Sequence, residues 1–160
     1  MTPELKSRIR STIQKCKALL MQEIAEQLEA VYGHKLDGRT ESVDNLPEVL
    51  ADEARQKTLH LLIDFLREEE LSGLSRPEAL AKLVNEAAFT HLNRLVALKM
   101  MENRKLIRQA VARGLESNGF KFYLADHPES MACYQRGETG EAYQEFLLWQ
   151  YGLFSSGDHL

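Results

Sequence analysis

Apolar side chains recur every three or four residues along most of this chain, the period of a helix with one buried face. The longest such pattern covers residues 82–105 and predicts a long central helix. We expect its polar Asn93 to face mostly apolar neighbours and to need hydrogen-bond partners there. The apolar positions of this helix are Leu83, Val84, Ala87, Ala88, Leu92, Leu95, Val96 and Met100.

The first half of the chain predicts two further helices. Thr2 is a suitable N-cap with a proline after it, and the helical period that follows continues until Gly33 offers a C-terminal cap. Residues 33–45 are rich in Gly, Asp and Asn and have no hydrophobic period, so a flexible loop is predicted there. A second helix is predicted to open near Pro47 and to stop at Ser72-Gly73.

The second half is less regular. Ser75 has capping-box spacing and a proline in the first turn, so the central helix is predicted to begin there and to end at either Asn103 or Gly114. Short turns follow, with a short helix or extended piece at 120–125, and a last helix is predicted over 138–154.

These elements predict an all-α fold in a single domain. We expect an irregular bundle of about four to six helices, with a long N-terminal helix and a long central helix. The domain is expected to span 1–160, with a linker-like tail at 155–160.

The distribution of charged residues along the chain adds to this picture. The formal net charge of -4 argues against a uniformly basic nucleic-acid binder. Basic residues nevertheless gather in 1–17 and 94–113, each of which holds one acidic residue. Solvation of exposed helix faces is the usual explanation, and contact with DNA phosphate is the alternative. The candidate DNA-contacting residues are Arg8, Arg10, Lys15, Lys17, Lys99, Arg104, Lys105 and Arg108.

Little else in the composition indicates chemistry. Cys16 and Cys133 lie far apart with no Cys-x-x-Cys partner, which is typical of reduced thiols in a cytoplasmic protein. No apolar run approaches the length that crosses a bilayer, so no membrane partner is expected. The five histidines are dispersed. We therefore expect no catalytic, cofactor-binding or metal-binding residue in this chain.

The amino-acid sequence of the central helix gives one further indication of function. The string Ala88-Phe89-Thr90, continued by 93–99 and then by Met101-Glu102, resembles a helix near the N-terminus of large adenine-specific DNA methyltransferases. These are the modification enzymes of the BREX and DISARM phage-defence systems and of related type IIG restriction-modification proteins. A weaker resemblance continues through 118–120 and 140–147, so roughly the second half of the chain is covered.

The resemblance implies the non-catalytic N-terminal helical domain of an N6-adenine DNA methyltransferase. Such a domain would scaffold the methyltransferase domain of the same parent chain, expected after Leu160, and would contact DNA backbone. The resemblance also implies that S-adenosylmethionine is the cofactor of that parent. It would bind outside this chain, because this chain has neither a glycine-rich cofactor turn nor an Asn/Asp-Pro-Pro-Tyr/Phe motif. Asp64 and Glu68, which lie in helical pattern, are interpreted as a solvated face and not as a nuclease site.

Several alternatives stay open. The Leu- and Phe-rich helices also suit a small protein–protein interaction or dimerisation module, including a homodimer. A stand-alone enzyme with a site assembled from distant residues is a third hypothesis. For Asn93 and Arg94 we favour an internal structural role, in which Arg94 pairs with Glu86 or Glu102. The other interpretation is an interface with the methyltransferase domain or with a DNA phosphate.

Overall fold

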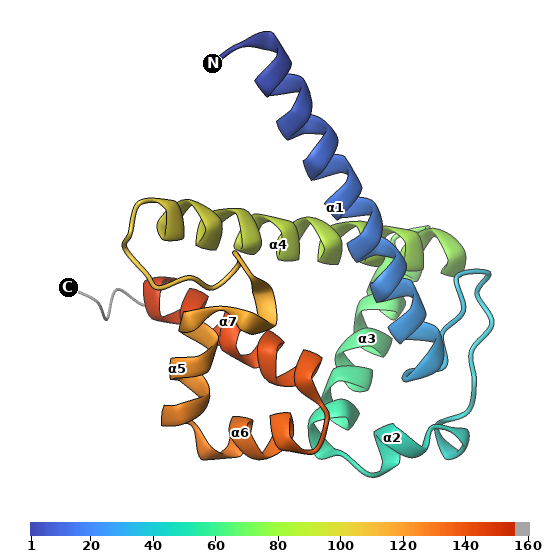
Figure 1. Ribbon diagram of the computed structural model, residues 1–160. Coiled ribbons are helices and arrows are strands. Elements are labelled where there is room, and N and C mark those ends of the chain that lie inside the picture. Colours follow the sequence, from blue (N-terminus) through green and yellow to red (C-terminus); the bar gives the residue numbers. More distant parts are fainter. Residues whose placement is uncertain (156–160) are drawn as a thin grey trace. The chain divides into compact units, whose positions relative to one another are not determined.

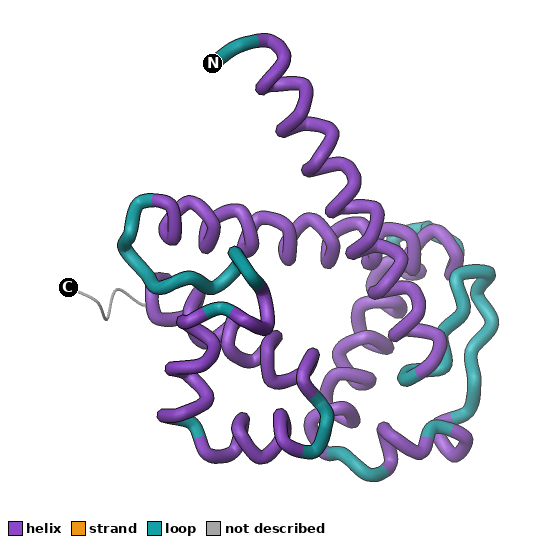
Figure 2. The backbone as a smooth tube through the Cα atoms, viewed as in Figure 1, coloured by secondary structure: helices purple, strands orange, loops and turns teal. Residues whose placement is uncertain are grey.

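The fold was taken from a computed structural model, which describes residues 1–155. Within these residues the chain forms seven α-helices and two short 3-10 helices and contains no strand (Figure 1, Figure 2). The predicted all-α fold is confirmed, including its long N-terminal and central helices. Residues 156–160 of the predicted tail lie outside the described residues, whereas Ser155 is the last residue of the final helix.

The first helix, α1 (Pro3–Ala30), begins and ends as the sequence predicted. The Oγ1 atom of Thr2 accepts a hydrogen bond from the Leu5 N–H at 3.2 Å, which caps the first turn. The helix stops ahead of Gly33, which has a φ of +66°. A Cβ atom at this position would lie 2.6 Å from the Cβ of Glu41, so the turn admits only glycine.

The predicted second helix is wrong in one respect, because the chain divides it into α2 (Pro47–Leu50) and α3 (Glu53–Leu71). The Asp52 side chain accepts a hydrogen bond from the Ala54 N–H at 2.9 Å. An aspartate in this role is a helix N-cap, so it starts a new helix where the apolar period alone indicated continuation. The predicted loop before α2 includes a short 3-10 helix, η1 (Val43–Asn45).

The central helix, α4, runs over Arg76–Asn103, so Asn103 is the correct one of its two predicted ends. The region beyond it holds η2 (Gly114–Glu116), α5 (Asn118–Asp126), α6 (Pro128–Gln135) and α7 (Thr139–Ser155).

The chain folds into two compact units, the first from Met1 to Leu92 and the second beginning at Asn93. The core of the first unit is aliphatic and joins residues of α1, α2, α3 and the first part of α4. Its buried members are Leu28, Leu46, Val49, Leu59, Leu62, Leu66, Ala79, Leu80 and Val84.

The core of the second unit is aromatic and is built by α5, α6, α7 and the segment before η2. Phe120, fully buried, packs edge-on against Tyr134 and Tyr143, with ring centroids 5.9 and 5.4 Å away. The buried members of this core are Ala110, Phe120, Tyr123, Leu124, Cys133, Ala142 and Phe146. The candidate site described below lies in this unit.

Candidate nucleic-acid interface

The second unit contains an irregular segment, residues 104–113, that we call the basic loop. One buried carboxylate sets its path. Oε2 of Glu102, at the end of α4, accepts hydrogen bonds from the N–H groups of Ala110, Val111 and Ala112 at 3.1, 2.9 and 3.1 Å. Its Oε1 receives the Lys99 ammonium at 3.2 Å. The Glu102 side chain is only 6% exposed, so these bonds are shielded from water.

The protonation of Glu102 reflects the same contacts. Burial acts to raise the pKa of this carboxyl, because it disfavours the charged form. The three backbone N–H donors and Lys99 outweigh burial, and the pKa lies below its ordinary value. Glu102 is therefore ionised at neutral pH and holds the loop as a carboxylate.

Two more contacts fix the loop backbone. The Tyr143 hydroxyl on α7 donates a hydrogen bond to the Ala110 carbonyl at 2.6 Å. The Gly119 N–H on α5 donates to the Gln109 carbonyl at 2.8 Å. A Cβ at position 119 would lie 2.4 Å from that carbonyl oxygen, so the close approach of loop and helix requires glycine.

The loop leaves α4 through a Schellman motif. The Leu106 N–H bonds to the Met101 carbonyl and the Lys105 N–H to the Glu102 carbonyl, which ends the helix at this point. Lys105 has a φ of 60°, where glycine is the usual residue. At the other end Arg113 has a φ of 65°. Two cationic residues thus hold left-handed conformations at the boundaries of the loop, and such local strain is frequent at functional sites.

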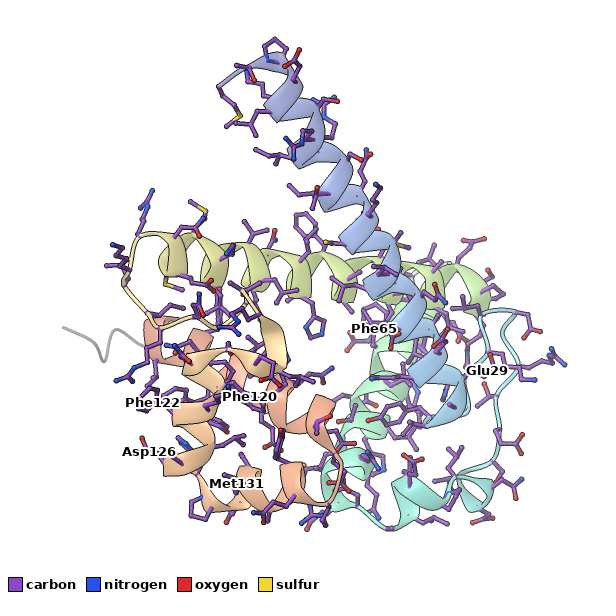
Figure 3. The ribbon with its side chains drawn as sticks, viewed as in Figure 1. Glu29, Phe65, Phe120, Phe122, Asp126 and Met131 are labelled. Atoms are coloured by element: carbon purple, nitrogen blue, oxygen red, sulfur yellow. The ribbon has the colours of Figure 1, made fainter. Side chains whose placement is uncertain are left out.

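The basic loop forms one wall of a surface pocket of about 530 Å³. Lys105 and Arg108 line it from the loop, Phe122 and Asp126 from α5, and Trp149 from α7. Figure 3 labels Phe122 and Asp126 on the same helix as the buried Phe120. The Arg108 guanidinium lies over the Phe122 ring, 4.1 Å from its centroid. The arrangement can bind anions through its cations and planar groups through its aromatic rings.

Of the predicted cationic residues, Arg104, Lys105 and Arg108 are brought together on this loop, and all three are exposed. Lys99 lies on α4 with its ammonium paired to Glu102, so its charge is partly satisfied within the fold. The other four belong to the first unit, on the N-terminal part of α1, where Arg8, Arg10 and Lys15 are exposed and Lys17 is half-buried.

The prediction for Asn93 is wrong, because its side chain is exposed. The buried residues Val84, Ala88 and Leu92 lie on another side of α4. Asn93 shares its side of the helix with the exposed apolar residues Phe89, Val96 and Met100. Apolar residues thus recur every three or four positions on both the buried and the exposed side, so their spacing could not distinguish the two. Within residues 1–155 the Asn93 side chain therefore does not make the predicted internal tie.

Arg94 is half-buried, and its guanidinium lies 5.7 Å from the centroid of the Tyr151 ring on α7. It was predicted to pair with Glu86 or Glu102. Glu102 instead binds Lys99 and the basic loop, so this prediction is wrong for the second of the two acids. The contact found for Arg94 is a cation–π interaction within the second unit.

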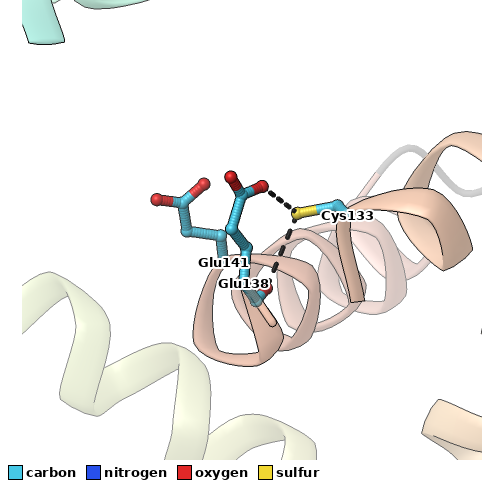
Figure 4. Close-up of side chains that lie close together, drawn as sticks. All are labelled: Cys133, Glu138 and Glu141. Atoms are coloured by element: carbon cyan, nitrogen blue, oxygen red, sulfur yellow. Dashed lines mark hydrogen bonds between the residues drawn. The ribbon is translucent and has the colours of Figure 1, made fainter. Parts of the chain in front are cut away.

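Cys133 lies beside Glu138 and Glu141 at the junction of α6 and α7 (Figure 4). Its single S–H proton is shared between two acceptors, the Glu138 carboxylate at 3.2 Å and the Glu138 carbonyl at 3.5 Å. Burial, and then the neighbouring Glu138, raises the pKa of the Cys133 thiol to about 11. The group is therefore a protonated donor that ties α6 to the residue preceding α7, and not an activated nucleophile.

Sequence reasoning missed the residues that organise this site. Glu102 was predicted only as a possible partner of Arg94. It is also the one acid among six cations in 94–113, and that isolation is a signal of its anchoring role. Phe122, Asp126 and Trp149 gave no such signal, because only the packing of α5 against α7 brings them to the loop.

Comparison of the chain with models of known protein families, with curated proteins and with solved structures gave no match. Among residues 1–155, no helix is both long enough and apolar enough to cross a membrane.

Proposed function

We propose that this chain is the non-catalytic N-terminal helical region of an adenine-specific DNA methyltransferase from a phage-defence or restriction-modification system. In this role it scaffolds the catalytic domain of the same parent chain, which binds S-adenosylmethionine, and contacts DNA backbone. A cytoplasmic location follows from that function and agrees with two free cysteines. The family assignment is supported by the sequence resemblance along α4.

One observation supports the DNA contact. The basic loop displays Arg104, Lys105 and Arg108 on a backbone that a buried carboxylate, a tyrosine hydroxyl and a glycine N–H hold in place. Cations on a fixed backbone lose less conformational entropy on binding phosphate than cations on a mobile segment. These residues lie in the half of the chain that carries the resemblance.

The test is the affinity of the chain for a labelled DNA duplex at several salt concentrations. We expect binding that weakens with salt, and a strong loss of affinity when Arg104, Lys105 and Arg108 are all replaced by glutamate. Arg136→Glu, at the exposed arginine that follows α6, is the control for a general change of charge. Unchanged DNA binding by the triple variant overturns the proposed contact.

A second candidate function, protein–protein association, is favoured by the first half of α1. Residues 1–15 are all exposed, and Leu5, Ile9 and Ile13 form an apolar stripe there with exposed fractions of 44, 40 and 38%. In Figure 1 this half of α1 extends away from the other helices of its own unit. A dimer in light scattering that Ile9→Glu converts to a monomer supports this function, and a monomer at all concentrations removes the homodimer.

A further inference from the structure

The pocket beside the basic loop contains side chains that contact with a DNA phosphate backbone would not require. Phosphate recognition requires cations and N–H donors, which Lys105 and Arg108 can supply. The pocket also exposes two aromatic side chains, Phe122 at 52% and Trp149 at 39%. Exposed rings in a concave site are costly in water and are a common feature of ligand pockets.

Both rings are held in position. The Arg108 guanidinium lies over the Phe122 ring, and both side chains line the pocket. The Trp149 indole lies 5.2 Å from the Tyr123 ring and 5.2 Å from the His127 ring, measured between centroids. Tyr123 is itself buried, and its hydroxyl bonds to Ser130 at 2.9 Å. The aromatic wall is therefore formed before any ligand arrives.

The acidic member of the lining narrows the choice of ligand. Asp126 places a carboxylate in the same pocket as Lys105 and Arg108. A carboxylate repels a purely anionic ligand, such as an acidic peptide side chain, but accepts hydrogen bonds from the N–H groups of a nucleobase. A ligand that joins an aromatic base to a phosphate can contact all of these groups. Its base can stack on the rings and donate a hydrogen bond to Asp126, and its phosphate can pair with Lys105 and Arg108.

We infer that this pocket binds an unpaired nucleotide of a nucleic-acid strand. The base lies against Trp149 and the Arg108–Phe122 pair, and the adjoining phosphate lies near Lys105 and Arg108. The inference rests on the proposed function, since it supposes that DNA approaches the basic loop. It adds that the loop and the pocket prefer a strand with accessible bases to a closed duplex.

Trp149 provides the readout, because it is the single tryptophan of the chain. The intact protein is titrated with a single-stranded oligothymidylate of about twelve nucleotides, within the range of site sizes known for single-strand binders. We expect saturable quenching of the Trp149 fluorescence. A strand of equal length with abasic sites keeps its phosphates, and is expected to bind at least about 5-fold more weakly and without quenching.

Two variants and two matched controls test whether single-strand binding takes place at this pocket. Phe122→Ala and Arg108→Gln are expected to weaken single-strand binding by about 5- to 50-fold, the loss typical of one base–aromatic stack. Phe89→Ala removes an aromatic side chain of similar exposure, 55%, and Arg136→Gln removes an exposed arginine. Both controls are expected to bind as the unchanged chain does. Because Phe122 and Arg108 are exposed, neither substitution should unfold the protein.

Three results overturn the inference, and they have different consequences for the proposed function. Equal binding of normal and abasic strands leaves the backbone contact standing and removes the base pocket. A free thymidine monophosphate that binds as tightly as the strand shows a site for a free nucleotide. If neither strand nor duplex binds, the proposed DNA contact falls as well.

Discussion

The carboxylate of Glu102 supplies the hydrogen bonds that a continued helix would have given to residues 110–112. Three backbone N–H groups converge on one oxygen atom, and the loop between them and α4 has no regular secondary structure. A buried carboxylate accepting several N–H bonds is strongly stabilised in its charged form. The shape of the basic loop therefore depends on one ionised side chain.

The first prediction follows from that charge. Glu102→Gln should lower the free energy of unfolding by about 1–2 kcal/mol at pH 7, since a charge-assisted set of bonds becomes neutral. The pKa of Glu102 is lowered in the fold, so its stabilisation is present above the ordinary carboxyl pKa and is lost as pH falls through the folded value. The difference between variant and unchanged chain should therefore shrink in acid.

Urea unfolding at pH 7, 5 and 3.5 measures this difference. Glu116→Gln is the control, because that carboxylate has a side chain 70% exposed and should matter little at any pH. A Glu102→Gln effect of equal size at all three pH values would contradict the assigned role.

Lys105 gives a second prediction. Its left-handed backbone costs a non-glycine residue about 1 kcal/mol. Lys105→Gly should raise the free energy of unfolding by about 0.5–1 kcal/mol while weakening DNA binding through the lost cation. Lys105→Ala removes the same cation and keeps the strain, so it should lose affinity with no gain in stability. Thermal unfolding and DNA titration of the two variants distinguish these effects.

The helices themselves followed from local signals. Thr2 and Ser75 marked two starts correctly, and the apolar period gave α1 and α4 nearly to their ends. The apolar period failed to predict the break at Asp52, where an N-cap starts a new helix. It also failed at Asn93, because two sides of α4 carry apolar residues there. The basic loop could not be derived, because Glu102 bonds to residues eight to ten positions away in no regular pattern.

The first half of α1 is a helix with little tertiary support. Core contacts of this helix are made by its second half, around Leu28. Deleting residues 1–15 should therefore change the free energy of unfolding by less than about 0.5 kcal/mol. Leu28→Ala should cost about 2–4 kcal/mol, as expected for a buried leucine.

Chemical unfolding followed by circular dichroism compares these two variants. A truncation that destabilises the chain by more than about 1 kcal/mol, in the range of core substitutions, would show that residues 1–15 pack against it. The apolar stripe at Leu5, Ile9 and Ile13 would then belong to the core and not to a binding surface.

The two units differ in what they offer a partner. The first unit has an aliphatic core and an exposed amphipathic helix end, which suits association with protein. The second has an aromatic core, a fixed cationic loop and a pocket with exposed rings, which suits nucleic acid. Of the two predicted cationic clusters, the one in the second unit contributes Lys105 and Arg108 to the lining of a pocket.

We propose that DNA contacts this chain at the basic loop. The most direct test of this contact is a backbone amide chemical-shift map of the isotope-labelled chain during titration with a single-stranded oligonucleotide. We predict the largest shifts at residues 104–108, at 119–126 and at 149–150. Shifts confined to residues 4–17, or no shifts at saturating DNA, would contradict the claim.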